Sequence, residues 1–359
     1  MWRVRLAIES NMCSYRGVRW DAQQVDSETA GTLPGLERLS GFVRTVRTPD
    51  FAGMTFHEVL ARSALNRVSS RAAVPFPWTV NPYRGCSHAC VYCFARPTHD
   101  YLGLDIGTGF DTEIVVKTNI AQVLAKELAA PRWQRETVAM GTNTDPYQRA
   151  EGRYRLMPGV IAALADHRTP FSILTKGTLL TRDLPLLASV SGRVEVSLGV
   201  SVAMVDKLVQ TALEPGAPTV EARLQLIRKI RQAGLSCMVL MAPILPYLTD
   251  SEPQMTAAIE ALVDAGASTI TPIVLHLRPG VREWFFRWLR SHRPDLIAGY
   301  ERLYRRGTNA DPLYRQQIIE RVNRIKTAAG CAPAAGPNWR NRREASRPAE
   351  PGPPSLFPL

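Results

Sequence analysis

Asn81-Pro-Tyr-Arg-Gly-Cys86-Ser-His-Ala-Cys90-Val-Tyr-Cys93-Phe-Ala-Arg96 is the stretch that decides the fold. It holds three of the six cysteines of the chain, at C-x3-C-x2-C spacing. Because the loop between them is short, the three thiolates can converge on one metal centre. A structural zinc site and an electron-carrying iron-sulfur cluster each normally take four protein ligands. Three thiolates leave one iron of a four-iron cluster open to a small molecule, and the spacing therefore predicts catalysis.

Two other interpretations of the cysteines remain open. A zinc ion is possible if one further side chain completes the ligand set, and the candidates are His88, His99, Cys237 and Cys331. A disulfide between Cys86 and Cys90 is also possible, although the chain shows no secretory context.

The motif Cys86-x3-Cys90-x2-Cys93, with Tyr92 before the last cysteine, resembles the cluster-binding motif of the radical S-adenosylmethionine (SAM) superfamily. The resemblance implies a 4Fe-4S cluster on these cysteines, SAM on the open iron, and Tyr92 beside the cofactor. It further implies that an electron cleaves SAM to methionine and a 5'-deoxyadenosyl radical, which takes a hydrogen atom from the substrate. The cofactor supplies this chemistry, and the protein positions it.

Length and composition fit one barrel domain with extensions. The chain has 359 residues, of which 45% are hydrophobic and 21% are charged, and a barrel domain needs about 250. No apolar run approaches the ~18 residues of a membrane span. The amino terminus lacks the features of a signal peptide, and Met12 is a second possible start. Six scattered cysteines suit a reducing compartment, so a cytoplasmic location is predicted.

The net charge of +12 favours polyanionic partners. Much of it lies at the carboxyl end, where seven basic residues from Arg321 onward stand against two acidic ones. Aromatic side chains alternate with arginines between Trp284 and Arg306, a pattern found in nucleic-acid-binding proteins. The alternatives are a helical packing face for this segment and a solubilising tail after it.

Alternating strand and helix patterns predict the architecture. Strand patterns occupy 137–141, 171–175, 194–200, 237–242 and 270–276, and helix patterns occupy 158–166, 179–188, 220–233, 253–265 and 281–291. Such alternation favours parallel strands with crossover helices. With a first strand just before Cys86 there are about six units. The predicted fold is α/β, a partial (βα)6 parallel barrel, and the radical SAM resemblance implies the same fold.

Five segments are predicted along the chain. They are an irregular leader over 1–50, an N-terminal helix and lead-in over 51–78, the barrel core over 79–291, a helical segment over 292–328 and a disordered basic Pro-rich tail over 329–359. Within the second segment, Thr55 is the expected cap of a helix that runs to about Val68. A short strand over 113–117 and a helix from Asn119 to Ala130 are expected as additions beside the core.

Candidate site residues follow the carboxyl ends of the strands, where barrels bind their ligands. The resemblance places the SAM amino group against the segment after the second strand, so main-chain carbonyls or the side chains of Thr142, Asn143 and Asp145 are expected to hold it. A simple turn is the alternative. Lys176, after the third strand, is expected to meet a carboxylate of SAM or substrate, and a solvated lysine is the alternative.

The fourth strand alternates polar and apolar residues, which places Glu195 and Ser197 on the face that lines the barrel. The resemblance implies contact of Ser197 with the SAM ribose or carboxylate, with Glu195 nearby. After the sixth strand, His276 and Arg278 are expected at the open mouth as substrate contacts, although a lone histidine is often structural. Arg223 is a further candidate to reach the site.

Within the superfamily the span from Thr48 to Lys326 most resembles proteins related to spore photoproduct lyase, but not the lyase itself. The lyase carries a hydrogen-donating cysteine after the second strand, where this chain has Thr142 to Asp145. Cys237 can replace it only if its thiol faces the cavity, and a buried inert thiol is the alternative. The predicted function is therefore radical SAM chemistry on an unidentified substrate.

Competing functions are a pyrimidine-dimer-type nucleic-acid repair lyase, a zinc-stabilised nucleic-acid-binding module and a non-catalytic iron-sulfur scaffold. The expected partners are an external electron donor, such as a flavodoxin or ferredoxin, and a substrate for which nucleic acid is one possibility. The sequence leaves the oligomeric state undetermined.

Overall fold

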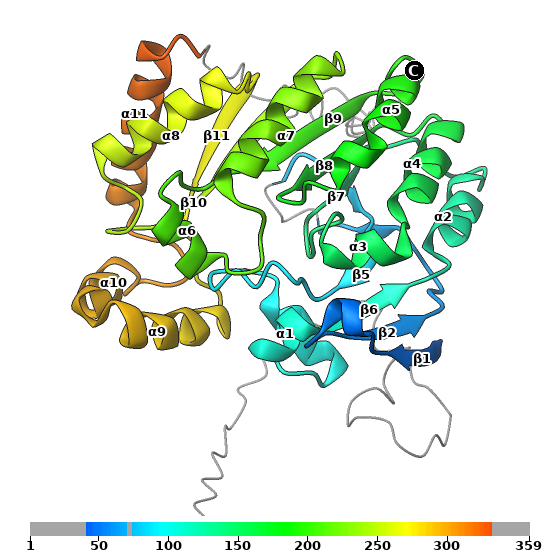
Figure 1. Ribbon diagram of the computed structural model, residues 1–359, viewed down its shortest axis with the longest axis horizontal. Helices are drawn as coiled ribbons and strands as arrows, with labels where there is room; N and C mark the ends of the chain where they lie inside the picture. Colours follow the sequence, from blue (N-terminus) through cyan, green and yellow to red (C-terminus); the bar gives the residue numbers. More distant parts are fainter. Residues whose placement is uncertain (1–40, 70–73, 332–359) are drawn as a thin grey trace, which may run out of the picture.

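A seven-stranded sheet forms the centre of the computed structural model, which describes residues 41–69 and 74–331 (Figure 1). Its strand order is β11-β10-β9-β8-β7-β4-β3. The bounds are β3 Asn66–Arg67, β4 Trp78–Thr79, β7 Val138–Met140, β8 Phe171–Thr175, β9 Val196–Ser201, β10 Cys237–Ile244 and β11 Thr269–Val274. All neighbours except β3 and β4 pair in parallel. Six parallel strands in sequence order confirm the predicted partial (βα)6 barrel.

Crossover helices cover the outer face of this sheet (Figure 1). They are α2 Ile120–Leu128, α4 Met157–Asp166, α5 Leu180–Ser191, α7 Val220–Gln232 and α8 Glu252–Asp264, with α11 Pro312–Ala328 against the edge strand β11. Local signals fix their starts: Thr219 caps α7 and accepts a hydrogen bond from the Ala222 amide, and Ser251 and Gln254 form a capping box on α8. Asn119 precedes α2 as predicted, but its side chain bonds the backbone of Ala61 instead.

A second, four-stranded sheet, ordered β1-β2-β6-β5, lies beside the barrel (Figure 1). Its strands are β1 Phe42–Val46, β2 Thr55–Val59, β5 Tyr83–Arg84 and β6 Glu113–Lys117. The predicted helix from Thr55 to Val68 is therefore wrong. All five residues of β2 are buried, with Phe56 packed on one face of the sheet and Val59 on the other. The next residue, Leu60, which a helix over this segment would bury, is 49% exposed. The sequence of β2, Thr-Phe-His-Glu-Val, has no strand-like apolar pattern, because His57 and Glu58 are buried through hydrogen bonds to Glu113 (2.6 Å) and Arg44 (2.8 Å). Periodicity does not show such pairings between distant residues.

The first and last predicted segments lie partly outside the described residues. Residues 1–40 and 332–359 fall there, and so does most of the predicted disordered tail. Residues 42–46 of the predicted irregular leader form β1. The other segment boundaries stay predictions.

The other helices of the described residues are α1 Thr108–Thr112, α3 Arg149–Tyr154, α6 Lys207–Leu213, α9 Val281–His292 and α10 Ile297–Leu303, together with the 3-10 turns Pro49–Phe51, Arg96–Leu102 and Pro294–Leu296. In the aromatic and basic segment, Phe285, Tyr300 and Tyr304 are fully buried and stack on one another or on Trp288. These aromatic rings form a packing face, as one of the two interpretations predicted. None of the described helices is long and apolar enough to cross a membrane.

Candidate active site

The cysteine loop, residues 85–94, follows β4 and the short strand β5. It lies at the edge of the sheet where the parallel strands have their carboxyl ends. Cys86 and Cys90 are buried, Cys93 is half-buried, and none of the three is in a disulfide. The loop turns tightly: the Cys93 amide donates to the Cys90 carbonyl (3.1 Å), and Ala89 adopts a φ of 52°. Free, neighbouring thiols on one loop are the arrangement that a cluster with three protein ligands requires.

Arg96 ties the end of this loop to the segment before α1. Its fully buried guanidinium donates to the carbonyls of Cys90 (3.0 Å) and Gly107 (2.6 Å) and pairs with Asp111 at 2.9 Å. The ring of Trp284 stacks 4.8 Å from it. The N–H groups of this buried cation all donate to carbonyls or to a carboxylate, so Arg96 orders the backbone around it. Removal of Arg96 or of Asp111 would leave a buried charge without its partner, which is costly.

A second segment, Leu213-Glu-Pro-Gly216, runs against the other side of the loop. The Val91 amide donates to the Leu213 carbonyl (3.0 Å), and the Gly216 amide donates to the His88 carbonyl (3.1 Å). A Cβ atom at Gly216 would stand 2.0 Å from the Ser87 carbonyl oxygen. Only glycine permits this close approach of two backbones.

Replacing Gly216 by alanine is therefore expected to displace the cysteine loop and to lower the free energy of unfolding by about 2 kcal/mol. Urea unfolding and the iron content per chain after anaerobic reconstitution measure the two effects. Gly192→Ala is the matched control, since a Cβ there meets nothing within 4 Å. Equal behaviour of the two variants would contradict the packing role of Gly216.

The segment after β7 forms hydrogen bonds to the backbone at the start of the cysteine loop. The side chains of Thr144 and Gln148 both donate to the Gly85 carbonyl, at 2.6 and 2.9 Å, and Gln148 Oε1 accepts from the Ser87 amide at 2.9 Å. Thr142 is half-buried and Asn143 exposed, and both contact the side chain of Asn81. Thr142 and Asn143 thus contact Asn81 at the start of the cysteine-containing stretch, and their contact with the SAM amino group stays a prediction. The sequence gives no indication of the contacts of Thr144 and Gln148.

The Asp145 carboxylate is fully used by the protein. It accepts hydrogen bonds from Thr175 Oγ1 (2.5 Å), the Lys176 amide (2.7 Å) and the Tyr147 amide (2.9 Å), and it lies 3.4 Å from His88 Nδ1. Burial alone would raise its pKa, but these partners lower the pKa of Asp145 to about 2. Asp145 joins two strand ends, so the prediction that it holds the SAM amino group is not supported.

A depressed pKa makes Asp145 a source of pH-dependent stability. The stabilisation, roughly 2 kcal/mol, is complete above pH 4 and is lost as the pH falls through about 2. Asp145→Asn is therefore expected to be less stable than wild type at pH 5 and to lose about 1 kcal/mol less between pH 5 and pH 3. Urea unfolding at the two pH values measures this. The exposed Asp166→Asn is the control, and identical pH slopes for Asp145→Asn and wild type would contradict the role.

The charged centre of the site lies where β8 and β9 end. Lys176 Nζ donates to Ser201 Oγ (3.1 Å), stands 3.8 Å from Glu214 Oε1 and lies 5.8 Å from the ring centre of Tyr92. The fully buried Glu214 carboxylate also accepts hydrogen bonds from the Tyr92 hydroxyl and from Arg223. Burial lowers the pKa of Lys176, but the charges of Glu214 and Cys90 outweigh this and raise it, so Lys176 is a cation.

Comparisons with known proteins bear on these contacts. The family model described as the radical SAM superfamily matches residues 80–274, more than half of the chain. The chain belongs to the radical SAM superfamily. It is 58% identical over 292 residues to the uncharacterized protein Rv2578c of Mycobacterium tuberculosis, covering 81% of this chain and 86% of the relative. The uncharacterized protein MJ0683 of Methanocaldococcus jannaschii is 25% identical over 175 residues, covering 49% and 63%.

Solved structures show the same fold. A spore photoproduct lyase mutant superimposes with a TM-score of 0.59 at 17% identity, covering 86% of this chain and 85% of that one. Spore photoproduct lyase complexed with dinucleoside spore photoproduct gives a TM-score of 0.58 at 16% identity, covering 76% and 79%. The predicted membership of the radical SAM superfamily is confirmed, and the chain shares the fold of this lyase. Radical SAM enzymes use a 4Fe-4S cluster and SAM, and they need an external electron donor.

Two predicted cofactor residues of the radical SAM barrel lie at the wrong end of their strand. Glu195 and Ser197 are exposed and stand where β9 begins, whereas the cysteines lie where it ends. Ser201, four residues later, has the same side-chain direction as Ser197 and contacts Lys176. At about 3.3 Å per residue the two serines are about 13 Å apart. The predicted face was correct and the predicted depth was wrong: the strand pattern over 194–200 already places both residues at its amino end, and the alternation of polar side chains does not distinguish one end of a strand from the other.

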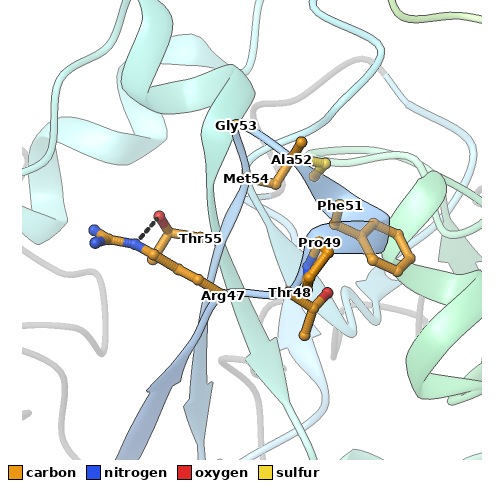
Figure 2. A pocket seen from close by; sticks show the side chains of 8 residues that line it. All are labelled: Arg47, Thr48, Pro49, Phe51, Ala52, Gly53, Met54 and Thr55. Atoms are coloured by element: carbon orange, nitrogen blue, oxygen red, sulfur yellow. Dashed lines mark hydrogen bonds between the residues drawn. The ribbon is translucent and has the colours of Figure 1, made fainter.

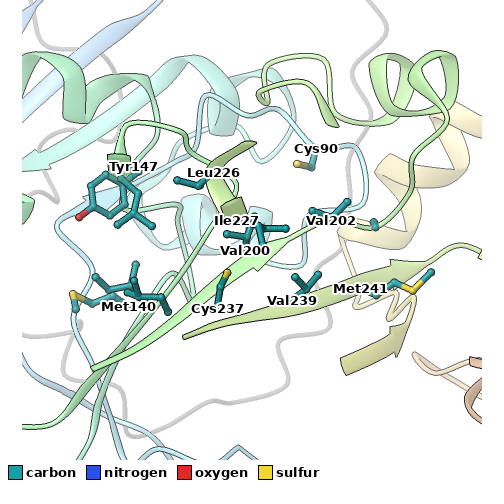
Figure 3. Packing of buried hydrophobic residues seen from close by; sticks show 14 of the residues in the cluster. Cys90, Met140, Tyr147, Val200, Val202, Leu226, Ile227, Cys237, Val239 and Met241 are labelled. Carbon is teal, nitrogen blue, oxygen red and sulfur yellow. The ribbon is translucent and has the colours of Figure 1, made fainter. Parts of the chain in front are cut away.

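Cys237 lies on the outer face of β10. Its side chain is fully buried among core residues that include Val200, Ile227 and Val239 (Figure 3). Burial raises the pKa of its thiol to about 12. Cys237 is thus the buried, inert thiol of the alternative interpretation, and it does not replace the hydrogen donor that the lyase carries.

The two predicted mouth residues after β11 have separate partners. His276 Nδ1 bonds Asn309 Oδ1 at 2.9 Å and joins an isolated bridge to the same residue, which is a structural role. The exposed Arg278 places its guanidinium 5.3 Å from the ring centre of Phe94, which directly follows Cys93 and is 43% exposed. The structure brings Arg278, but not His276, into contact with the cysteine loop.

The donor set fits a four-iron cluster better than a zinc ion. Among residues 41–69 and 74–331, no three His, Cys, Asp or Glu side chains converge as ligands of a single ion would. Thiolates of an iron-sulfur cube bind different irons and stand further apart. Of the proposed fourth zinc ligands, His88 lies 3.4 Å from Asp145 and His99 Nε2 bonds the Glu113 carbonyl at 2.8 Å.

A hollow of about 400 Å³ lies in the hairpin between β1 and β2, around Arg47, Phe51 and Thr55 (Figure 2). A single loop forms it, and none of its lining residues belongs to the site described above.

Proposed function

We propose that this chain is an enzyme that binds a 4Fe-4S cluster through Cys86, Cys90 and Cys93 and cleaves SAM reductively to act on an unidentified substrate. Membership of the superfamily supports radical chemistry of this general kind. The observation that carries the proposal is the set of three free cysteines on one short, firmly held loop. When bound, the cluster supplies the electron that converts SAM to methionine and a 5'-deoxyadenosyl radical.

The residues of the chain itself have three roles in this proposal. Cys86, Cys90 and Cys93 would hold the cluster through their thiolates, and the cluster would supply an iron without a protein ligand. Lys176, held by Ser201 and Glu214 at the ends of β8 and β9, carries the cation that receives the SAM carboxylate. Tyr92 and the segment around Thr142 and Asn143 form the wall beside the cofactor.

The substrate is proposed to bind at the open mouth of the barrel, beside Arg278 and Phe94. These residues form an exposed cation above an apolar ring, which suits a partner that carries an anionic group next to a flat apolar part. Nucleic acid meets that description and stays one possibility among several. Repair of a thymine dimer is the weaker candidate, because neither the segment after β7 nor Cys237 supplies a thiol to the barrel interior. The cytoplasmic location and the identity of the electron donor stay predictions.

Release of 5'-deoxyadenosine tests the proposal. Anaerobically purified and reconstituted protein, incubated with dithionite and SAM, is expected to form 5'-deoxyadenosine and methionine in amounts that depend on both reagents. The products are quantified by chromatography with mass detection. A zinc-stabilised binding module would contain zinc and no cluster after reconstitution, and an iron-sulfur scaffold would contain a cluster but leave SAM intact. Either result would contradict the proposed function.

A further inference from the structure

One buried carboxylate joins the two sides of the site. Glu214 is fully buried and accepts from the hydroxyl of Tyr92, which lies between Cys90 and Cys93 on the cysteine loop. It pairs with Arg223, whose side chain is 1% exposed, and it stands 3.8 Å from Lys176 Nζ. Arg223 is in turn fixed by the carbonyls of Pro218 (2.8 Å) and Ser201 (3.2 Å). One anion therefore bridges two cations and the cysteine loop.

The position of Glu214 is determined by backbone contacts as well as by its side chain. The preceding residue, Leu213, accepts a hydrogen bond from the amide of Val91, the residue after Cys90. The following turn is held against Ser87 and His88 by Gly216. The backbone on both sides of Glu214 is therefore fixed against the cysteine loop. The position of the carboxylate follows from these backbone contacts and not from the rotamer of the side chain alone.

The charges of Glu214, Arg223 and Lys176 act electrostatically on a metal cluster bound by the three cysteines. Glu214 with Arg223 and Lys176 gives a net charge of +1, because two cations face one anion. Glu214 and Arg223 are fully buried and the Lys176 side chain is 13% exposed, so salt and water weaken their field much less than they weaken the field of surface charges. The reduction potential of an iron-sulfur cluster depends on nearby charge, hydrogen bonds and solvent exposure. Reduction adds one electron and makes or breaks no bond, so the added charge is the only change that the field must accommodate.

We propose that Glu214 is a positioning residue that holds Lys176 and Tyr92 against the cysteine loop and, by cancelling the charge of one of the two neighbouring cations, sets the reduction potential of the cluster. This inference rests on the proposed function, since it requires a bound cluster. If Glu214 had only a structural role, its replacement would affect the stability of the fold. The reduction potential would then not shift in opposite directions on loss of the Glu214 anion and on loss of the Arg223 cation.

The test replaces the charged residues singly and together and measures the reduction potential of the cluster in each variant. Wild type, Glu214→Gln, Arg223→Met and the double variant are reconstituted anaerobically, and the fraction of reduced cluster is followed by EPR at defined potentials without SAM. Loss of the anion in Glu214→Gln is expected to favour the reduced cluster by about tenfold, ~59 mV upward for one electron. Arg223→Met is expected to shift the potential downward by a similar amount. The double variant, with its net charge restored, is expected near wild type.

Glu195→Gln is the matched control, because it makes the same chemical change on an exposed side chain at the opposite end of β9, and it is expected to leave the potential unchanged. If Glu214→Gln alone holds no cluster, the proposal still requires the double variant to have a higher potential than Arg223→Met. Shifts of the same sign in both single variants, or none in either, would overturn the inference. Failure of wild type to assemble a cluster would instead overturn the proposed function.

Discussion

Cys90→Ala is expected to abolish both the cluster and the cleavage of SAM, so that 5'-deoxyadenosine formation falls to the background of protein-free controls. The reason is that a four-iron cluster bound by three thiolates has no spare protein ligand, and loss of one thiolate leaves two. Iron and sulfide content, the brown absorbance of the reconstituted protein and product release measure the effect. The same loss is expected for Cys86→Ala and Cys93→Ala.

Cys237→Ala and Cys331→Ala are the controls for this prediction. Both residues are buried and free, but neither lies on the cysteine loop. Each variant is expected to keep its iron and to release 5'-deoxyadenosine at a rate near that of wild type. A cluster that survives in Cys90→Ala but is lost in Cys237→Ala would mean that the ligands had been assigned to the wrong cysteines.

Lys176→Met is expected to weaken SAM binding by about 10-fold to 100-fold while the cluster content stays unchanged. A charge-assisted hydrogen bond contributes about 1.5–3 kcal/mol, and methionine keeps the length of the side chain without its charge. The KM for SAM is expected to rise more than kcat falls, because the lysine binds the carboxylate in the ground state as well as during cleavage. Arg223 still balances Glu214 in this variant, so the fold is expected to persist.

Lys207→Met, on the exposed start of α6, is the control for the loss of a lysine charge. An unchanged KM in Lys176→Met would assign the lysine to the internal ion pair alone. Lys176→Arg restores the charge but not the geometry, and it is expected to recover only part of the affinity.

Local sequence signals predicted the parts of this protein that depend on neighbouring residues. Three cysteines within one short loop can meet without help from the rest of the chain, and the strand pattern of 171–175 coincides with β8. Periodicity also assigned the correct face of β9. It failed at the depth of the site, where Ser201 and not Ser197 contacts Lys176, because alternation is the same at both ends of a strand and does not show which polar residue of the face reaches the site.

The contacts between distant segments left no local signal. Glu214 lies in a loop whose composition reads as a turn, and only the folded chain brings it against Tyr92, 122 positions earlier. Gln148 is similarly ordinary in sequence but bonds Ser87. The segment from Thr55 to Val59 was predicted as a helix because its pairing with β6, more than fifty residues later, is invisible to periodicity. Buried ionic networks and small mixed sheets thus escaped prediction for the same reason.

The response of the reduced cluster to SAM tests the open coordination position most directly. EPR spectra of dithionite-reduced protein are recorded before and after addition of SAM. A cluster held by Cys86, Cys90 and Cys93 alone is predicted to change its signal, because the amino and carboxylate groups of SAM bind the fourth iron. A spectrum that SAM leaves unchanged in a fully reconstituted protein would show that this iron is not free to bind SAM, and would contradict the account.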